Sequence, residues 1–192
     1  MNDAATRPPP ALARILQRTA HLGFDAACDV RTGALLRALA AMRPGGWLVE
    51  LGTGTGAGTA WLLDGMDQHA RLITIDNDPA AQAIARDELG GDQRLEIICA
   101  DARAWLAGAV PNTADLVFAD TWAGKYEMLE ASLALLRPGG VWIGDDLLPQ
   151  PNWPEGHAAR VPKLLEALNA LSGHAVVPLA WASGIVLVTR RA

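Results

Sequence analysis

Short apolar runs alternate with longer amphipathic segments from residue 47 onward. The runs are too short for helices and are bounded by Gly, Pro or Asp, which is typical of buried strands in a parallel sheet. The segments between them carry apolar residues at helical spacing. The predicted strands cover 47–51, 71–75, 94–99, 115–119 and 141–144, and the predicted helices between them cover 57–66, 79–89, 102–107 and 125–136.

The two ends of the chain follow other patterns. Residues 1–10 predict a polar arm, and two helices are expected over 11–22 and 30–42. A proline-rich loop over 147–156 leads to a helix over 158–171. Strands over 174–181 and 184–189 are then expected to form a hairpin through Ala182 and Ser183.

Alternation of strands and helices predicts an α/β fold with a doubly wound, Rossmann-like sheet. The sheet should have about seven strands, mostly parallel, with the C-terminal hairpin antiparallel. Residues 1–192 are expected to form a single domain. Within it, residues 1–43 supply the arm and the first helices, and residues 44–192 supply the functional core.

A glycine-rich turn follows the first predicted strand, with Gly52, Gly54, Gly56 and Gly58 spaced by two. Glycines allow a sharp turn and let a ligand lie against the main chain, next to the free N–H groups of the following helix. The spacing from Gly52 through Gly54 to Ala57 also fits the dinucleotide fingerprint. A nicotinamide-dependent oxidoreductase therefore remains an alternative at this point.

Aspartates follow each of the other four strands that precede the hairpin. Because ligands in open α/β sheets bind beyond the carboxyl ends of the strands, these side chains should converge on a binding edge. Helix capping is the competing role for Asp76 and Asp101, although Asp78 is better placed to cap the helix after the second strand. The aspartates at the strand ends are Asp76, Asp101, Asp120, Asp145 and Asp146.

Composition narrows the partners and the compartment. The net charge is −5 and no basic run occurs, so nucleic acid is not expected as a partner. No apolar run reaches transmembrane length, and the N-terminus lacks the order of a signal peptide, so no membrane association is expected. Cys28 and Cys99 are far apart and fit no metal spacing. A reducing, cytoplasmic location is therefore predicted.

From residue 47 to the C-terminus, the ordered motifs resemble a class I S-adenosylmethionine-dependent methyltransferase. The closing hairpin fits that class, which ends in an antiparallel strand. The resemblance is carried by Glu50-Leu-Gly-Thr-Gly-Thr-Gly56, Asp76, Asp101-Ala102 and Arg137-Pro-Gly-Gly140.

Within the class, the chain is most similar to small-molecule O-methyltransferases of the catechol and caffeoyl-CoA type. Phe118-Ala-Asp120, Lys125-Tyr126 and Asp145-Asp146 carry this similarity. The family's lysine usually follows its aspartate by three residues, whereas Lys125 follows Asp120 by five. The family also usually has Asp-Asn where this chain has Asp145-Asp146.

The resemblance implies methyl transfer from S-adenosylmethionine to a hydroxyl oxygen of a small molecule, by in-line displacement. A small-molecule methyl acceptor is the expected partner, and a homodimer is left open. A catalytically inactive cofactor-binding protein is the non-enzyme alternative. The implied cofactor residues are Glu50, Gly52, Thr53, Gly54, Gly56, Asp76, Asn77, Asp101, Ala102 and Asp120.

Individual roles follow for some of these residues. Asp76 is expected to bind the ribose hydroxyls, Asp101 the adenine amino group, and Glu50 the methionine end of the cofactor. The catalytic candidates are Asp120 and two potential general bases, Lys125 and His157.

A divalent cation is the last expectation. The fourth and fifth strands should be neighbours, so Asp120, Asp145 and Asp146 should lie close together. Mg²⁺ or another hard cation would relieve their repulsion and bind the acceptor oxygen. An ion-pair network or a capping role is the alternative for these acids.

Overall fold

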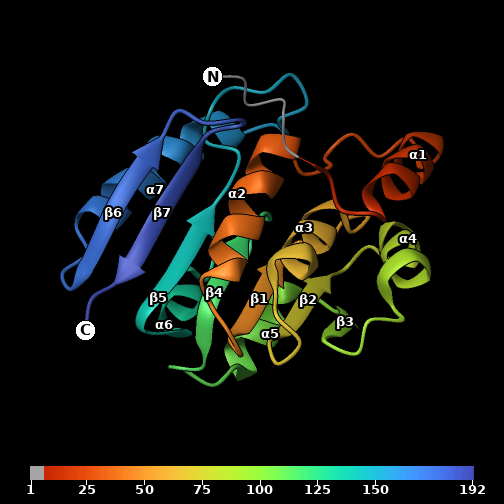
Figure 1. The fold of residues 1–192 in the computed structure, drawn as a ribbon. Coiled ribbons are helices and arrows are strands. Elements are labelled where there is room, and N and C mark those ends of the chain that lie inside the picture. The colour runs from red at the N-terminus through yellow and green to blue at the C-terminus, as the bar shows by residue number, and fades with distance from the viewer. Residues whose placement is uncertain (1–6) are drawn as a thin grey trace.

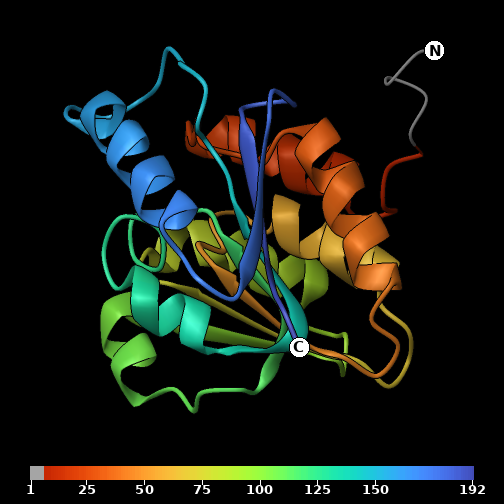
Figure 2. The ribbon, with the colours of Figure 1, turned by 90° about the vertical axis from the view of Figure 1, so that its left-hand side faces the viewer.

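The computed structural model describes residues 7–192, which form a seven-stranded sheet with helices on both faces (Figures 1 and 2). Residues 1–6 of the predicted arm lie outside the described residues. The strands are β1 (Trp47–Leu51), β2 (Arg71–Asp76), β3 (Leu95–Cys99), β4 (Ala114–Ala119), β5 (Leu136–Gly144), β6 (His174–Leu179) and β7 (Ile185–Arg190). The helices are α1 (Leu12–Leu22), α2 (Val30–Ala41), α3 (Ala57–Gly65), α4 (Pro79–Leu89), α5 (Ala102–Gly108), α6 (Leu129–Ala134) and α7 (His157–Asn169).

The sheet confirms the predicted fold class. Its strand order is β3-β2-β1-β4-β5-β7-β6. The first five strands pair in parallel, whereas β7 lies antiparallel between β5 and β6. From β1, successive strands β2 and β3 are added toward one edge of the sheet. From β4, strand β5 is added toward the other edge. The strand order therefore reverses between β1 and β4, which is where such sheets bind ligands.

Side-chain alternation along the strands divides the core into two layers. Leu48 of β1 packs with helices α1 to α4 on one face, whereas Val49 and Leu51 pack with α5, α6 and α7 on the other. Helices α2 and α3 approach closely because Gly33 faces the ring of Trp61, where a Cβ would lie 2.2 Å from the nearest ring atom. The alternation also turns Glu50 toward the layer that contains α3.

Two boundaries differ from the prediction. The helix expected over 125–136 is observed only as α6, because residues 125–127 donate their backbone N–H groups to the carbonyl of Trp122 in a turn. Met128 then adopts a left-handed conformation with φ of 56°. Strand β5 starts at Leu136 rather than at Val141, and its pairing with β4 is interrupted at residues 137–140.

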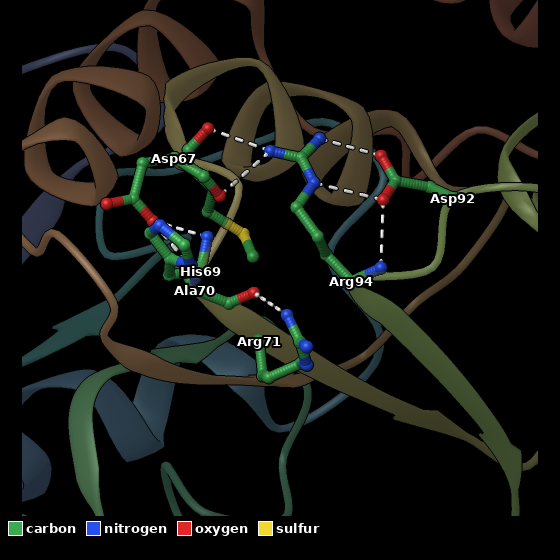
Figure 3. A network of polar contacts seen from close by, with 7 residues as sticks. Asp67, His69, Ala70, Arg71, Asp92 and Arg94 are labelled. Atoms are coloured by element: carbon green, nitrogen blue, oxygen red, sulfur yellow. Dashed lines mark hydrogen bonds and ion pairs between the residues drawn. The ribbon is translucent and has the colours of Figure 1, made fainter.

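A polar network holds the sheet edge at the amino ends of β2 and β3, opposite the strand ends that carry the aspartates (Figure 3). Arg94 donates to the carbonyls of Met66 and Asp67 and forms a two-pronged ion pair with Asp92. The Asp67 carboxylate accepts from the N–H groups of Gly45, His69 and Ala70, and these hydrogen bonds lower its pKa. Within residues 7–192, no helix has the length and apolarity needed to cross a membrane.

We expect Arg94→Ala to lower the free energy of unfolding by about 1–3 kcal/mol, because charged hydrogen bonds to two carbonyls and to Asp92 are lost together. Arg71→Ala is the matched control, because Arg71 is exposed and, among the described contacts, its side chain donates only to the carbonyl of Ala70. Urea denaturation of both variants measures the difference. Equal losses in the two variants would show that the network does not stabilise this edge.

Candidate functional site

Three adjoining cavities lie beyond the carboxyl ends of the strands. We name them the Asp76 cavity, the Glu50 cavity and the Asp145 cavity, with volumes of about 200, 180 and 300 Å³. The first two share Gly52, Asp76 and Thr121 in their walls, and the last two share residues 26–28 and Asp120. The shared walls make one groove along the sheet edge, and all five predicted strand-end aspartates line it.

The loop between β1 and α3 forms one wall of this groove. Gly52 and Gly54 have φ angles of 104° and 49°, a backbone region that favours glycine. A Cβ at Gly52 would lie 3.2 Å from the backbone of Asp120. Gly56 is the N-cap of α3 and, unlike Gly52, Thr53 and Gly54, does not line the cavities. The loop therefore exposes main chain to the groove.

Glu50 is buried, and only one of its two carboxylate oxygens accepts hydrogen bonds from the described residues. Its Oε2 accepts hydrogen bonds from the hydroxyls of Thr59 (2.5 Å) and Thr74 (2.6 Å). Its Oε1 has no hydrogen-bond partner among residues 7–192, although Glu50 lines the Glu50 cavity. Burial raises the pKa of Glu50 to about 7. A cationic donor placed in this cavity would satisfy the free oxygen.

Asp76 does not cap the helix that follows it. Its carboxylate accepts from the N–H groups of Gly54 (2.8 Å) and Asp78 (3.0 Å), one on each oxygen. Asp78 is the cap of α4 and accepts from the N–H groups of residues 80 and 81. Asp76 thus lines two cavities and keeps lone pairs for a ligand.

Asp101 is a helix cap in this structure. It accepts from the N–H of Arg103 at the start of α5, and its carboxylate also pairs with the Arg103 guanidinium at 2.6 Å. The hydrogen bonds from Arg103 lower the pKa of Asp101 to about 2. Asn77 and Ala102 line the Asp76 cavity beside it. Asp101 therefore caps α5, and its predicted contact with adenine stays a prediction.

The Asp145 cavity is strongly acidic. Burial raises the pKa of Asp145 to about 6, and burial together with the nearby Asp145 carboxylate raises the pKa of Asp120. Asp145 Oδ1 accepts from the N–H of Asp146 and from the hydroxyl of Ser183. Among other residues, the cavity is lined by Asp25, Asp29, Arg31, Asp120, Asp145 and Asp146.

The predicted cation site is not supported by this geometry. Within residues 7–192, no group of three or more His, Cys, Asp or Glu side chains is arranged to hold a metal ion. Asp145 is buried and turned toward Ser183, and Asp146 sits in a left-handed turn with φ of 64°. The sequence brings Asp120, Asp145 and Asp146 to one cavity, and of these three carboxylates Asp145 is held by hydrogen bonds from Asp146 N–H and the Ser183 hydroxyl.

The three catalytic candidates are placed differently. Asp120 lines both the Glu50 and the Asp145 cavities, at their junction. Lys125 is buried behind this wall, and its Nζ donates to the carbonyl of Asp145 at 2.8 Å. His157 is also buried, with Nε2 2.9 Å from the hydroxyl of Tyr126. Neither Lys125 nor His157 lines any of the three cavities.

The groove also contains residues that sequence reasoning missed. The loop before α2 supplies Phe24 and Cys28, the turn after β4 supplies Thr121, and the hairpin supplies Ser183. None belongs to a local motif, because each reaches the groove only through tertiary packing. Only Thr121 had a local signal in the sequence, because it comes directly after the aspartate at the end of a predicted strand.

Comparison with known proteins places the chain in a family. A family model described as a methyltransferase domain matches residues 49–147, more than half of the chain. The chain belongs to this methyltransferase domain family. The matched region begins in β1 and ends after Asp146, so it contains the glycine loop and every strand-end aspartate of the groove.

Relatives of this methyltransferase domain include two proposed mycobacterial O-methyltransferases. The protein of Mycobacterium sp. (strain JLS) is 36% identical over 137 residues, which cover 69% of this chain and 62% of the relative. The protein of Mycobacterium ulcerans (strain Agy99) is 31% identical over 164 residues, which cover 74% of this chain and 73% of the relative. The chain thus spans about three fifths of the length of the first relatives it matches.

Solved structures share the fold of this methyltransferase domain. The O-methyltransferase TomG from Streptomyces achromogenes, in complex with SAM, superposes with a TM-score of 0.81 at 23% identity, covering 98% of this chain and 92% of that chain. The Bacillus cereus O-methyltransferase, in complex with SAH, has a TM-score of 0.82 at 20% identity, covering 98% and 94%.

We expect Glu50→Gln to stabilise the protein by about 1–3 kcal/mol at pH 8 and by much less at pH 5. Burial raises the pKa of Glu50 to about 7 in the folded protein, against 4.5 for a free glutamate. The wild type therefore carries no penalty below pH 4.5, loses stability progressively as the pH rises from 4.5 to about 7, and loses no more above that. Glutamine can accept from both threonines without ionising.

Urea denaturation at the two pH values measures this effect. Glu96→Gln is the matched control, because Glu96 is an exposed acid on the edge strand β3. The same change in stability at both pH values would show that Glu50 is ionised, or that its protonation is not linked to folding.

Proposed function

We propose that this protein transfers the methyl group of S-adenosylmethionine to a hydroxyl oxygen of a small molecule. In this proposal the cofactor occupies the Asp76 and Glu50 cavities, and the acceptor occupies the Asp145 cavity. The observation that carries the proposal is the free Oε1 of Glu50, buried under a glycine loop at the strand order reversal. Membership of the methyltransferase domain family supports it.

The residues present fit this cofactor. It carries a positively charged amino group, and a buried carboxylate oxygen without a donor is the complementary group. Asp76 keeps free lone pairs that suit two neighbouring hydroxyls, as on a ribose. A Cβ at Gly58 would lie 2.6 Å from the free oxygen of Glu50, so a side chain there would block the site. Asn77, Asp101 and Ala102 would line the adenine end.

When bound, the cofactor supplies a methyl group activated by its sulfonium. The remaining tasks fall to the chain, which must align the acceptor and remove its proton. Asp120 is the residue we assign to the proton, because it lines both the Glu50 and the Asp145 cavities. Its raised pKa makes the carboxylate a stronger base than an exposed aspartate. Lys125 lies behind it and limits how far the pKa rises.

The size and polarity of the Asp145 cavity indicate the class of acceptor. A cavity of about 300 Å³ with polar walls suits a small hydroxylated molecule rather than a polymer. The curated relatives at 31–38% identity are proposed O-methyltransferases, which favours oxygen as the atom methylated. Assembly as a homodimer stays a prediction.

We expect Asp76→Ala to weaken S-adenosylhomocysteine binding by about ten- to a hundredfold, the loss of one or two charged hydrogen bonds. Asp78→Ala is the matched control, because it removes the cap of α4. It should lower the free energy of unfolding by about 1 kcal/mol and leave the affinity unchanged. Calorimetric titration and urea denaturation of both variants separate the two roles. Equal affinity in Asp76→Ala and the wild type would remove Asp76 from the cofactor site.

We expect S-adenosylhomocysteine to raise the melting temperature and NAD to leave it unchanged, since a ligand that binds only the native state stabilises it. The reverse result would favour an oxidoreductase. A screen of catechols, other phenols and hydroxylated carboxylates, followed by homocysteine release, then looks for the acceptor. Asp120→Asn should bind S-adenosylhomocysteine normally but lose most of any transfer found. Binding without transfer to any acceptor would favour the inactive scaffold.

A further inference from the structure

His157 lies at the centre of an aromatic cluster behind the groove. Its ring stacks on Trp153 at 4.3 Å and meets the edges of Tyr126 and Trp122 at 5.2 and 6.3 Å between ring centroids. Trp122 and Tyr126 belong to the turn after β4, Trp153 belongs to the loop after β5, and His157 begins α7. The cluster therefore joins the turn after β4 to the end of the 147–156 loop and the start of α7, about 30 residues later in the sequence.

The hydrogen bonds of His157 identify which nitrogen carries its proton. Nε2 lies 3.0 Å from the carbonyl oxygen of Asp146, which can only accept. A hydrogen bond to this carbonyl requires the hydrogen on Nε2, and the Tyr126 oxygen at 2.9 Å then shares that hydrogen. In this tautomer Nδ1 holds the lone pair, and among residues 7–192 it is buried without a hydrogen-bond partner. That lone pair does not face the groove, so His157 is not placed to act as a general base.

The contacts of His157 reach two cavities through other residues. Trp122 lines the Asp76 cavity, and Asp146 lines the Asp145 cavity. Asp146 adopts a left-handed conformation, which a hydrogen bond to its carbonyl helps to hold. Trp153 comes from residues 147–156, the segment that supplies Gln150 and Asn152 to the wall of the Asp145 cavity.

The segment 147–156 has a second set of attachments on the opposite side. Leu147 and Leu148 donate to the carbonyls of Gly184 and Ser183 in the hairpin. The side chain of Asn152 donates to the carbonyl of Asp25 in the loop before α2. None of these attachments involves the turn after β4. At its C-terminal end, His157 contacts Trp122 directly after the segment, and Arg160, one turn further along α7, lies over the Trp122 ring at 4.1 Å as a second contact.

We infer that His157 is a positioning residue, which fixes the 147–156 wall of the acceptor cavity to the Trp122 wall of the cofactor cavity. A ligand that orders Trp122 would then also order the wall of the acceptor cavity. The assignment of the two cavities to cofactor and acceptor rests on the proposed function, but the link between the two walls does not.

The experiment is amide hydrogen exchange on the full chain, with and without S-adenosylhomocysteine. His157→Phe keeps an aromatic ring but removes the bond to the Asp146 carbonyl. His157→Gln keeps an N–H donor near the position of Nε2 and is the rescue variant. Tyr126→Phe is the matched control, because it removes a hydroxyl from His157 and leaves the bond to Asp146 in place.

Without ligand, we expect the amides of residues 147–156 to exchange about three- to tenfold faster in His157→Phe, as for the loss of one hydrogen bond. His157→Gln and Tyr126→Phe should stay within about twofold of the wild type. Unchanged exchange in His157→Phe, or equal acceleration in Tyr126→Phe, would overturn the inference. If His157→Phe does not fold, faster exchange in His157→Gln than in Tyr126→Phe also counts against it.

With S-adenosylhomocysteine, the wild type should be protected both at residues 121–127 and at residues 147–156. In His157→Phe the first segment should remain protected and the second should not. Protection of both segments in His157→Phe would refute the coupling. If the ligand protects no segment and does not shift the melting temperature of the wild type, the proposed cofactor fails, and the measurement without ligand still decides whether His157 holds the wall.

Discussion

The burial of Glu50 is the constraint on which the arrangement of the site depends. A buried carboxylate near the end of an interior strand is costly unless its oxygens are hydrogen-bonded. The chain meets this need with Thr59 from α3 and Thr74 from β2, which tie the glycine loop to the neighbouring strand. A Cβ at position 58 would lie 2.6 Å from the remaining oxygen, so Gly58 leaves that oxygen its space. One buried acid is thereby in close contact with two threonines and a glycine around the loop.

The charged groups at the two ends of the parallel strands are arranged in opposite ways. At the amino ends, Asp67, Asp92 and Arg94 satisfy one another and nearby backbone groups, which makes a closed network (Figure 3). At the carboxyl ends, burial raises the pKa of both Asp120 and Asp145, and the neighbouring Asp145 carboxylate raises the pKa of Asp120 further. The first arrangement contributes stability. The second arrangement raises the pKa of carboxylates toward neutral pH. Raised pKa values of this kind cost stability and are common at functional sites.

The sequence was sufficient for features that depend on local pattern. Apolar runs and their flanking glycines and prolines predicted each strand, and the end of each strand placed the aspartates at one edge. The same reasoning separated Asp78, the cap of α4, from Asp76. Strand order at the hairpin and the short α6 needed tertiary information. The helix expected from residue 125 fails because three N–H groups turn back to the carbonyl of Trp122, and helical periodicity does not report such a turn.

The site was predictable to the extent that it is built from strand ends. Glu50, Asp76 and Asp120 follow from position in a strand, whereas Phe24 and Ser183 arrive from segments distant in sequence. The direction of each side chain could not be predicted from the sequence either, because it also depends on contacts with distant segments. Asp145 lies in the same cavity as Asp120 as expected, but its carboxylate accepts from a hydroxyl of the hairpin, and within residues 7–192 the acids form no group that could hold a metal ion.

The role of His157 also depends on surroundings that the sequence does not reveal. A histidine at the start of a helix near acidic residues suggests a base, and its position along the chain supports that idea. Its surroundings decide otherwise, because the hydrogen on Nε2 is committed to the Asp146 carbonyl and the lone pair on Nδ1 is enclosed by packing. A titratable residue can do chemistry only where its lone pair is accessible, and accessibility is a property of the fold. The enclosing rings of Trp122 and Trp153 instead make this histidine a mechanical link between two walls of the groove.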